Sequence, residues 1–293
     1  MYSLSIPLKT EDPEKFTYLS NYRKVSSMKN PDLRFGFGKN WKRYIEKNFS
    51  EERVQISQNI LLGFLGFENL EGKYFLDIGC GSGLHSLAAL RAGAKKIVSF
   101  DYDPDSVLTT KRLREYAGNP EHWELYQGSI LDKEFLKTIE PADIVYSWGV
   151  LHHTGNMWTA LDNTAALAKS GSLLYIALYD YDIQENPPPE FWLDVKQNYN
   201  RANWFGKRGM EWWYIWNFAL NKELQNVPQL LKVISGYKQS RGMAFYTDIV
   251  DWLGGWPMEF AKREDVKYWA DRMGLKILTM KTGEANTEYL FGK

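Results

Sequence analysis

The pattern of apolar and polar positions changes at residue 73 of this chain, and the change marks the start of a predicted sheet. From there to residue 180, short apolar or β-branched runs alternate with amphipathic segments. The runs resemble buried strands in length and composition, and the segments between them have helical periodicity. We predict strands at Tyr74–Ile78, Lys96–Phe100, Trp123–Tyr126, Ala142–Trp148 and Ser172–Tyr179. We predict helices at Leu84–Ala92, through Val107, Leu108, Leu113 and Tyr116, and at Trp158–Ala168.

This alternation implies βαβ units, and therefore an α/β fold with a doubly wound, mostly parallel sheet. A helix around Glu264–Arg272 and strands at Leu275–Thr282 and Glu288–Phe291 resume the pattern later in the chain. Together these elements predict seven strands in a Rossmann-like arrangement. Before the sheet, Ser50 is a good N-cap for a helix that ends near Gly66.

The segment from Asp180 to Ala261 interrupts the alternation and is unusually rich in aromatic residues. We interpret it as a mainly helical insertion. The sequence then divides into an N-terminal helical extension or flap at residues 1–70, a sheet domain at residues 71–180 and 262–293, and a helical insertion or substrate cap at residues 181–261.

Two aromatic groups within this insertion have more than one interpretation. The run Trp212-Trp213-Tyr214-Ile215-Trp216 predicts a helix buried on several faces, because nearly every position is aromatic. The same run could instead border an apolar ligand. Trp252 and Trp256 flank a Gly-Gly turn, and they either pack the insertion onto the sheet or help it close over a pocket.

Composition excludes several classes of protein. The chain has 293 residues and a formal net charge of zero, so it lacks the basic excess expected of a non-specific polyphosphate binder. A basic strip of Lys39, Lys42, Arg43 and Lys47 is interpreted as a solvated helix face, with a nucleic-acid contact as the alternative. One cysteine, Cys80, allows no internal disulfide, and no secretory signal or membrane-spanning run is evident. A cytoplasmic protein is expected.

A glycine-rich turn joins the first predicted strand to the first predicted helix. It reads Phe75-Leu76-Asp77-Ile78-Gly79-Cys80-Gly81-Ser82-Gly83. Dinucleotide sites use the spacing G-x-G-x-x-G, whereas these glycines follow G-x-G-x-G with an acid two residues upstream. An acid would repel a pyrophosphate, but it would attract a sulfonium cofactor with a free ammonium group. A plain glycine-rich turn is the alternative interpretation.

This turn resembles the first motif of the class I S-adenosylmethionine-dependent methyltransferases. The resemblance implies S-adenosylmethionine as cofactor, S-adenosylhomocysteine as product, and cofactor contacts from the turn and from the ends of later strands. Asp101 would accept both ribose hydroxyls, and Tyr102 would lie against the adenine. Asp101 could also cap the following helix. The implied contact residues are Asp77, Gly79, Cys80, Gly81, Gly83, Asp101, Tyr102, Ser129, Ile130 and Trp148.

The loop after the fourth predicted strand contains adjacent histidines, His152 and His153. Ligands of doubly wound sheets sit outside the carboxyl ends of the strands, so this loop faces the cofactor site. A histidine suits the removal of a proton from an oxygen or nitrogen acceptor, and His153 is the leading candidate base. The pair resembles one in quinone- and sterol-type methyltransferases, where it could simply brace the loop. No third metal ligand is evident, so no metal is expected.

The stretch from Arg241 to Glu259 resembles a segment of uncharacterised methyltransferases associated with surface-polysaccharide or natural-product pathways. Asp251, Glu259 and Tyr246, together with Asp248, are further catalytic or substrate-binding candidates. Residues 35–38, with the sequence Phe-Gly-Phe-Gly, are a candidate flap over the cofactor.

The sequence therefore predicts transfer of a methyl group from S-adenosylmethionine to an oxygen or nitrogen of a small or carrier-linked metabolite, with sugars among the candidates. Two alternatives remain open: an RNA (tRNA) methyltransferase, against which the neutral charge argues, and a non-catalytic protein that binds S-adenosylmethionine. The sequence identifies neither the acceptor nor the oligomeric state.

Overall fold

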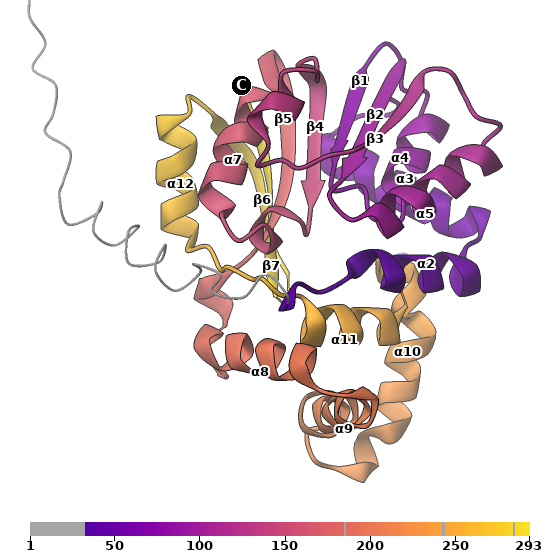
Figure 1. Ribbon diagram of the computed structural model, residues 1–293, viewed down its shortest axis with the longest axis vertical. Coiled ribbons are helices and arrows are strands. Elements are labelled where there is room, and N and C mark those ends of the chain that lie inside the picture. Colours follow the sequence, from indigo (N-terminus) through magenta and orange to yellow (C-terminus); the bar gives the residue numbers. More distant parts are fainter. Residues whose placement is uncertain (1–32, 185, 242–243, 284) are drawn as a thin grey trace, which may run out of the picture.

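The computed structural model describes residues 33–184, 186–241, 244–283 and 285–293, with a seven-stranded sheet at its centre (Figure 1). The strand order is β3-β2-β1-β4-β5-β7-β6, and only β7 runs antiparallel to its neighbours. The predicted seven-stranded, mostly parallel sheet is confirmed. The strands are β1 (Tyr74–Ile78), β2 (Lys96–Asp101), β3 (Trp123–Gln127), β4 (Ala142–Trp148), β5 (Ala168–Tyr179), β6 (Lys276–Thr282) and β7 (Asn286–Gly292).

The strand order fixes where a ligand can sit. The chain leaves β1 toward β2 on one side, while β4 pairs with β1 on the other, so the order reverses between β1 and β4. In open α/β sheets the crevice outside the carboxyl ends of the strands at such a point is the usual ligand site. The glycine turn after β1 and the histidine loop after β4 flank this crevice.

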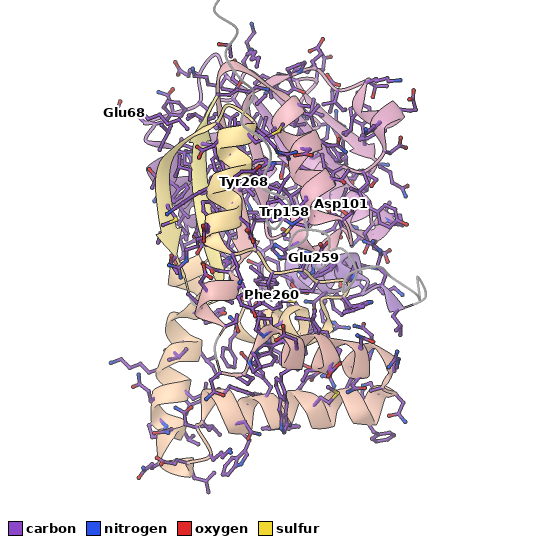
Figure 2. The ribbon with its side chains drawn as sticks, turned by 90° about the vertical axis from the view of Figure 1, so that its left-hand side faces the viewer. Glu68, Asp101, Trp158, Glu259, Phe260 and Tyr268 are labelled. Carbon is purple, nitrogen blue, oxygen red and sulfur yellow. The ribbon has the colours of Figure 1, made fainter. Side chains whose placement is uncertain are left out.

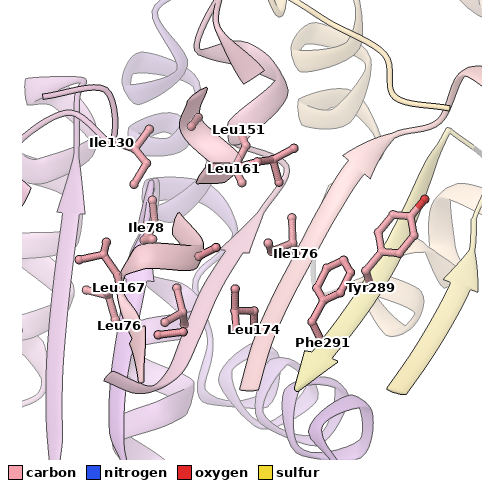
Figure 3. Packing of buried hydrophobic residues seen from close by; sticks show 14 of the residues in the cluster. Leu76, Ile78, Ile130, Leu151, Leu161, Leu167, Leu174, Ile176, Tyr289 and Phe291 are labelled. Atoms are coloured by element: carbon pink, nitrogen blue, oxygen red, sulfur yellow. The ribbon is translucent and has the colours of Figure 1, made fainter. Parts of the chain in front are cut away.

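Helices cover both faces of the sheet (Figure 1). On one face lie α3 (Glu51–Leu65), α4 (Leu84–Arg91) and α5 (Pro104–Tyr116); on the other lie α6 (Lys133–Leu136), α7 (Met157–Ala166) and α12 (Arg263–Arg272). Buried aliphatic and aromatic residues between α7, α12 and the strands form the larger core cluster (Figure 3). Ser50 accepts a hydrogen bond from the amide of Arg53, and Gly66 ends α3 in the left-handed region, as predicted.

One prediction about α5 is wrong. Leu113 is buried as predicted, but Leu108 and Tyr116, which were also expected on the apolar face, are exposed. The buried face carries Ser106, Thr109 and Thr110 beside Leu113. The reason is close packing: a Cβ atom on Gly83 would lie 2.9 Å from the Cα of Thr110. Only small side chains fit where α5 approaches the glycine turn this closely.

The insertion is helical and lies beyond the carboxyl edge of the sheet (Figure 1). It comprises α8 (Pro189–Arg201), α9 (Trp204–Tyr214), a π-helical turn (Ile215–Ala219), α10 (Val227–Arg241) and α11 (Phe245–Gly254). Trp192, Leu253 and Phe260 form its core, against which Tyr179 at the end of β5 and Trp252 pack. The N-terminal helix α2 (Phe37–Asn48) contacts both α5 and α11, between the sheet and the insertion.

The expected burial of the aromatic run is wrong for Trp212 and Trp216, which are both exposed. The buried position of α9 is instead Glu211. The basic strip on α2 is exposed, as predicted.

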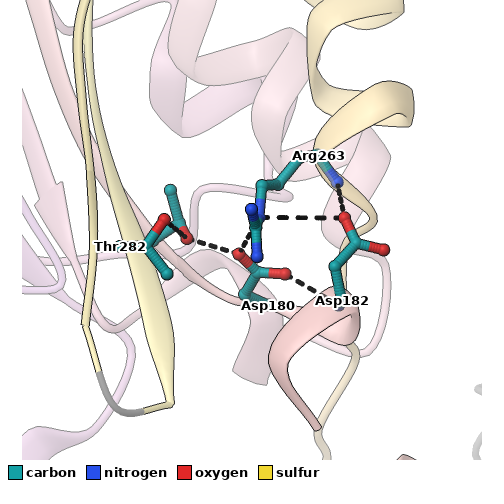
Figure 4. Close-up of polar contacts among 5 residues, drawn as sticks. Asp180, Asp182, Arg263 and Thr282 are labelled. Atoms are coloured by element: carbon teal, nitrogen blue, oxygen red, sulfur yellow. Dashed lines mark hydrogen bonds and ion pairs between the residues drawn. The ribbon is translucent and has the colours of Figure 1, made fainter. Parts of the chain in front are cut away.

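A polar cluster fastens the insertion to the sheet where the insertion begins and ends (Figure 4). The buried carboxylate of Asp180 accepts hydrogen bonds from the Arg263 side chain at 2.8 Å and from the Thr287 hydroxyl. Asp182 accepts the backbone amide of Arg263 at 3.0 Å. The two boundaries of the insertion are therefore held side by side. No helix in the described part of the chain has the length and apolarity needed to cross a bilayer.

Candidate functional site

A cavity of about 1160 Å³ lies at the carboxyl edge of the sheet and continues under the insertion. Its walls come from the turn after β1, the ends of β2 and β4, the N-terminal segment and the helices of the insertion. Pockets for one small ligand occupy roughly 300–1,000 Å³. This cavity therefore has room for a cofactor and a second molecule.

The glycine turn opens onto this cavity with the backbone geometry that only glycine adopts easily. Gly79 and Gly81 have φ angles of 73° and 55°, and the amides of Gly79 and Cys80 bond to the carbonyl of Phe100. A Cβ atom on Gly79 would lie 2.3 Å from Val150. Gly83 does not line the cavity, because its lack of a side chain serves the contact with α5.

Two buried carboxylates face the same space. Asp101 accepts the amide of Gly81 at 2.9 Å with one oxygen and the amide of Asp103 at 2.8 Å with the other. Asp77 accepts the hydroxyl of Ser86 at 2.5 Å. Burial raises the pKa of Asp101 to about 6 and the pKa of Asp77 to about 7. Two carboxylates that are poorly solvated favour a ligand that carries positive charge and hydroxyl donors.

Nine of the ten predicted cofactor residues line the cavity, Gly83 being the exception. Asp101 is the last residue of β2, and Figure 2 shows it above Glu259 and Phe260, which lie where the insertion rejoins the sheet domain. The Tyr102 ring is exposed, with the guanidinium of Arg34 5.0 Å from its centroid. Burial raises the pKa of the Cys80 thiol well above its usual value, so Cys80 stays protonated and acts as a packed residue.

His153 is held in one tautomer and lines the cavity. Its Nδ1 lies 2.8 Å from the carbonyl oxygen of Pro257. A carbonyl can only accept, so Nδ1 carries the proton and Nε2 keeps its lone pair. Nε2 has no hydrogen-bond partner among the described residues. Burial lowers the pKa of His153 to about 3, which keeps the ring neutral.

Three other candidates already have structural partners and do not line the cavity. His152 is buried, and its Nδ1 accepts the amide of Tyr179 at 3.3 Å, so it braces the loop. Glu259 accepts the amide of Met157 at the start of α7. Tyr246 donates its hydroxyl to Glu211 at 2.5 Å on the far side of the insertion.

Asp251 and Asp248 do line the cavity. Asp251 accepts the side-chain amide of Asn40, from α2, at 2.8 Å. Burial raises the pKa of Asp251 to about 8, so it is mostly protonated at neutral pH. Behind it, the buried Lys196 donates to the carbonyl of Trp252, and its ammonium lies 4.4 Å from the centroid of that ring. Burial lowers the pKa of Lys196 to about 7.

The structure adds a set of polar residues that the sequence did not reveal. Tyr146, Tyr175 and Glu288 project from β4, β5 and β7 into the cavity wall, and His85 joins them from α4. Tyr175 donates its hydroxyl to Glu288. The Tyr146 hydroxyl has no hydrogen-bond partner among the described residues, although its side chain is buried. Burial lowers the pKa of His85 to about 4, so this imidazole is neutral.

These residues were missed because each lies in a segment that was interpreted only as a buried strand or helix. Polar groups within otherwise apolar strands, such as the hydroxyls of Tyr146 and Tyr175, were the available signal. In the described part of the chain, no group of three His, Cys, Asp or Glu side chains is placed to hold a metal ion.

Comparisons with known proteins agree with this geometry. Residues 50–230 match a family model described as a methyltransferase domain. A ribosomal protein L11 methyltransferase from Psychrobacter is 32% identical over 120 residues, which are 41% of this chain and 33% of that protein. The chain thus spans about a third of the length of the curated relatives that it matches.

Two solved structures share the fold at low sequence identity. A Methanococcus maripaludis chain assigned as an S-adenosyl-L-methionine-dependent methyltransferase has a TM-score of 0.51 and 15% identity, covering 91% of this chain and 96% of that chain. An O-methyltransferase family protein from Burkholderia thailandensis has a TM-score of 0.54 and 12% identity, covering 96% of this chain and 70% of that chain.

Proposed function

The chain belongs to the methyltransferase-domain family and uses S-adenosylmethionine, and from this premise we propose that it methylates an oxygen or nitrogen of a small or carrier-linked metabolite. The observation that carries the proposal is the neutral His153, which keeps an unprotonated Nε2 and lines the same cavity as Asp77, Asp101 and the glycine turn. The Nε2 lone pair can take the proton that a hydroxyl or ammonium acceptor loses as it gains the methyl group. Because a pKa of about 3 disfavours the protonated ring in the free protein, this step requires the bound ligands to raise the pKa of His153.

The residues around the turn suit the cofactor. Asp101 has already ordered the turn by accepting two backbone amides, and each carboxylate oxygen retains a second lone pair for a hydroxyl donor. Asp77 supplies negative charge close by. S-adenosylmethionine supplies an electrophilic methyl group on a sulfonium centre. The chain must then position an acceptor, exclude water and remove the proton of the acceptor.

We place the acceptor in the rest of the cavity, with the insertion acting as a substrate cap. Aromatic and aliphatic side chains of the cap, including Tyr214, Phe218 and Leu230, form one wall. The strand ends form the opposite wall with Tyr146, Glu288 and their neighbours. An acceptor with an apolar body and hydroxyl or amino groups fits both walls. Its apolar body is stabilised against the cap because apolar surface is removed from water, and its polar groups supply hydrogen-bond partners for the buried polar groups at the strand ends.

Methyl-labelled S-adenosylmethionine tests this proposal. The protein is incubated with a cell extract that is afterwards separated into small molecules, lipids, RNA and protein. We expect label in the small-molecule or lipid fraction, and none above the enzyme-free background in RNA or protein. Label confined to RNA would establish the RNA methyltransferase alternative, and label confined to protein would also refute the proposal.

The pH dependence of cofactor binding follows from the raised pKa of Asp77. In the free protein this carboxyl is largely protonated below its pKa of about 7, and a positively charged ligand favours the ionised form. The affinity for S-adenosylmethionine should therefore rise with pH between about 5 and 7 and level off above that range. Titration calorimetry at a series of pH values measures this rise.

The variant Asp77→Asn provides the control for this pH dependence. It should bind more weakly at neutral pH and keep only the part of the rise that Asp101 contributes near pH 6. An affinity that does not change with pH in the unaltered protein would contradict the assignment of Asp77 to the cofactor site.

A further inference from the structure

The outer surface of the cap carries aromatic side chains that no other part of the described chain covers. Trp204, Phe205 and Trp212 on α9 are 65%, 77% and 70% exposed. Trp212 follows Phe205 by about two helical turns, so these two side chains share one face of the helix, and the Trp204 ring lies beside Phe205 with their centroids 4.9 Å apart. Large exposed apolar patches mark sites of interaction with another protein or with a membrane.

The contacts on the inner face of α9 fix the orientation in which Trp204, Phe205 and Trp212 are exposed. Glu211, the buried residue of the helix, accepts the hydroxyl of Tyr199 at 2.7 Å and the guanidinium of Arg208 at 2.7 Å. Its other oxygen accepts the hydroxyl of Tyr246. The helix is thus attached to the cap through this carboxylate and through Met210, Trp213 and Tyr214, which pack against the core of the cap, while Trp204 and Trp212 face outward. The helix therefore carries apolar side chains on its outer face as well as on its inner face, whereas an ordinary surface helix has a polar outer face.

Charge around the patch indicates what it contacts. Residues 201–234 contain five Lys and Arg residues against two Glu residues, in a chain whose net charge is zero. One of the two acids, Glu211, is paired inside the cap. Arg201, Lys222 and Lys232 are exposed. Tryptophan and phenylalanine flanked by basic residues are typical of helices that lie in the interface of an anionic membrane. A second copy of this chain would instead bring positive charge against positive charge.

The position of the patch supports the same partner. Figure 1 shows α9 at the end of the insertion farthest from the sheet, where a flat surface can approach it. On α10, Leu230 and Val233 line the cavity, and their neighbours Leu231 and Ile234 are exposed. On α10, apolar surface therefore continues from the outside of the cap to the cavity wall.

We propose that the outer surface of the cap, formed by Trp204, Phe205, Trp212 and the exposed side chains of α10, binds the lipid–water interface of an anionic membrane. The protein docks on the bilayer through this surface without spanning it. In this position the cavity can receive an amphipathic acceptor directly from the lipid phase, which avoids transfer of its apolar body through water.

Vesicle flotation with the full chain tests the proposal. Vesicles of phosphatidylcholine with phosphatidylglycerol should carry the protein upward in a density gradient, and vesicles of phosphatidylcholine alone should carry much less. The triple variant Trp204→Ser, Phe205→Ser, Trp212→Ser should reduce bound protein by about tenfold or more, because each substitution removes apolar area from the interface.

A matched variant separates this effect from a general loss of surface hydrophobicity. Leu108→Ser with Leu278→Ser removes exposed apolar residues from the sheet domain and should float like the unaltered protein. Unchanged S-adenosylmethionine affinity in the triple variant shows that it is folded. Absence of flotation for the unaltered protein, or equal flotation of all variants, would overturn the proposal. So would a triple variant that loses a dimer in solution while vesicle binding is unchanged. None of these outcomes depends on which fraction receives methyl label.

Discussion

Asp101→Asn should weaken S-adenosylmethionine binding by about a hundredfold or more. Asp101 uses one oxygen for the amide of Gly81 and the other for the amide of Asp103. Asparagine keeps one acceptor, but its NH₂ group must face one of these amide donors, so one bond becomes a repulsion and the negative charge is lost. Hydrogen bonds to charged groups are worth about 1.5–3 kcal/mol each. Loss of both this bond and a bond to the cofactor accounts for the expected effect.

Titration calorimetry measures this loss, and Asp132→Asn is the matched control. Asp132 lies in the loop after β3, and its carboxylate also accepts two backbone amides, those of Glu134 and Phe135, both on Oδ1. It does not line the cavity. The control should therefore bind the cofactor with unchanged affinity. Equal losses in the two variants would mean that disturbed loops, rather than a contact in the cavity, explain the result. Unchanged affinity in Asp101→Asn would contradict the proposed cofactor site.

His153→Asn should lower turnover by about 10²- to 10⁴-fold, the usual range for loss of a general base. The asparagine amide can still donate to the carbonyl of Pro257, so the loop keeps its hydrogen bond. What disappears is the Nε2 lone pair. Because the cofactor contacts are elsewhere, affinity for S-adenosylmethionine should not change.

Turnover is followed as S-adenosylhomocysteine released in the presence of the fraction that accepts methyl label. His122→Asn replaces an exposed histidine outside the cavity and should turn over normally. Turnover in His153→Asn that equals the control would show that His153 only supports the loop. Proton removal would then fall to another cavity group or to water.

The roles of the two histidines show what sequence reasoning could not separate. Both histidines were identified as candidates from their position in the loop after β4, because ligands of such sheets bind outside the carboxyl ends of the strands. Which of them faces the ligand depends on partners distant in sequence: Pro257 orients His153, and Tyr179 occupies His152. The same limit applies to Glu259 and Tyr246, whose partners are in α7 and α9. The sequence showed which side chains have the chemistry of a catalytic residue. It did not show which of them are already bonded to other parts of the protein and so cannot face the ligand.

The sequence alone determined the strands, the glycine turn and the carboxylate of Asp101. These features depend on local properties: strand periodicity, the backbone freedom of Gly79, and the position of an acid at the end of a strand. Only the tertiary structure decided which groups share the cavity and which surfaces remain uncovered. Tyr146 and Glu288 meet there because β7 enters the sheet beside β5. Trp212 points outward, whereas its neighbour Glu211 is the buried residue of α9. Such outcomes depend on contacts between segments far apart in the chain, which local pattern does not encode.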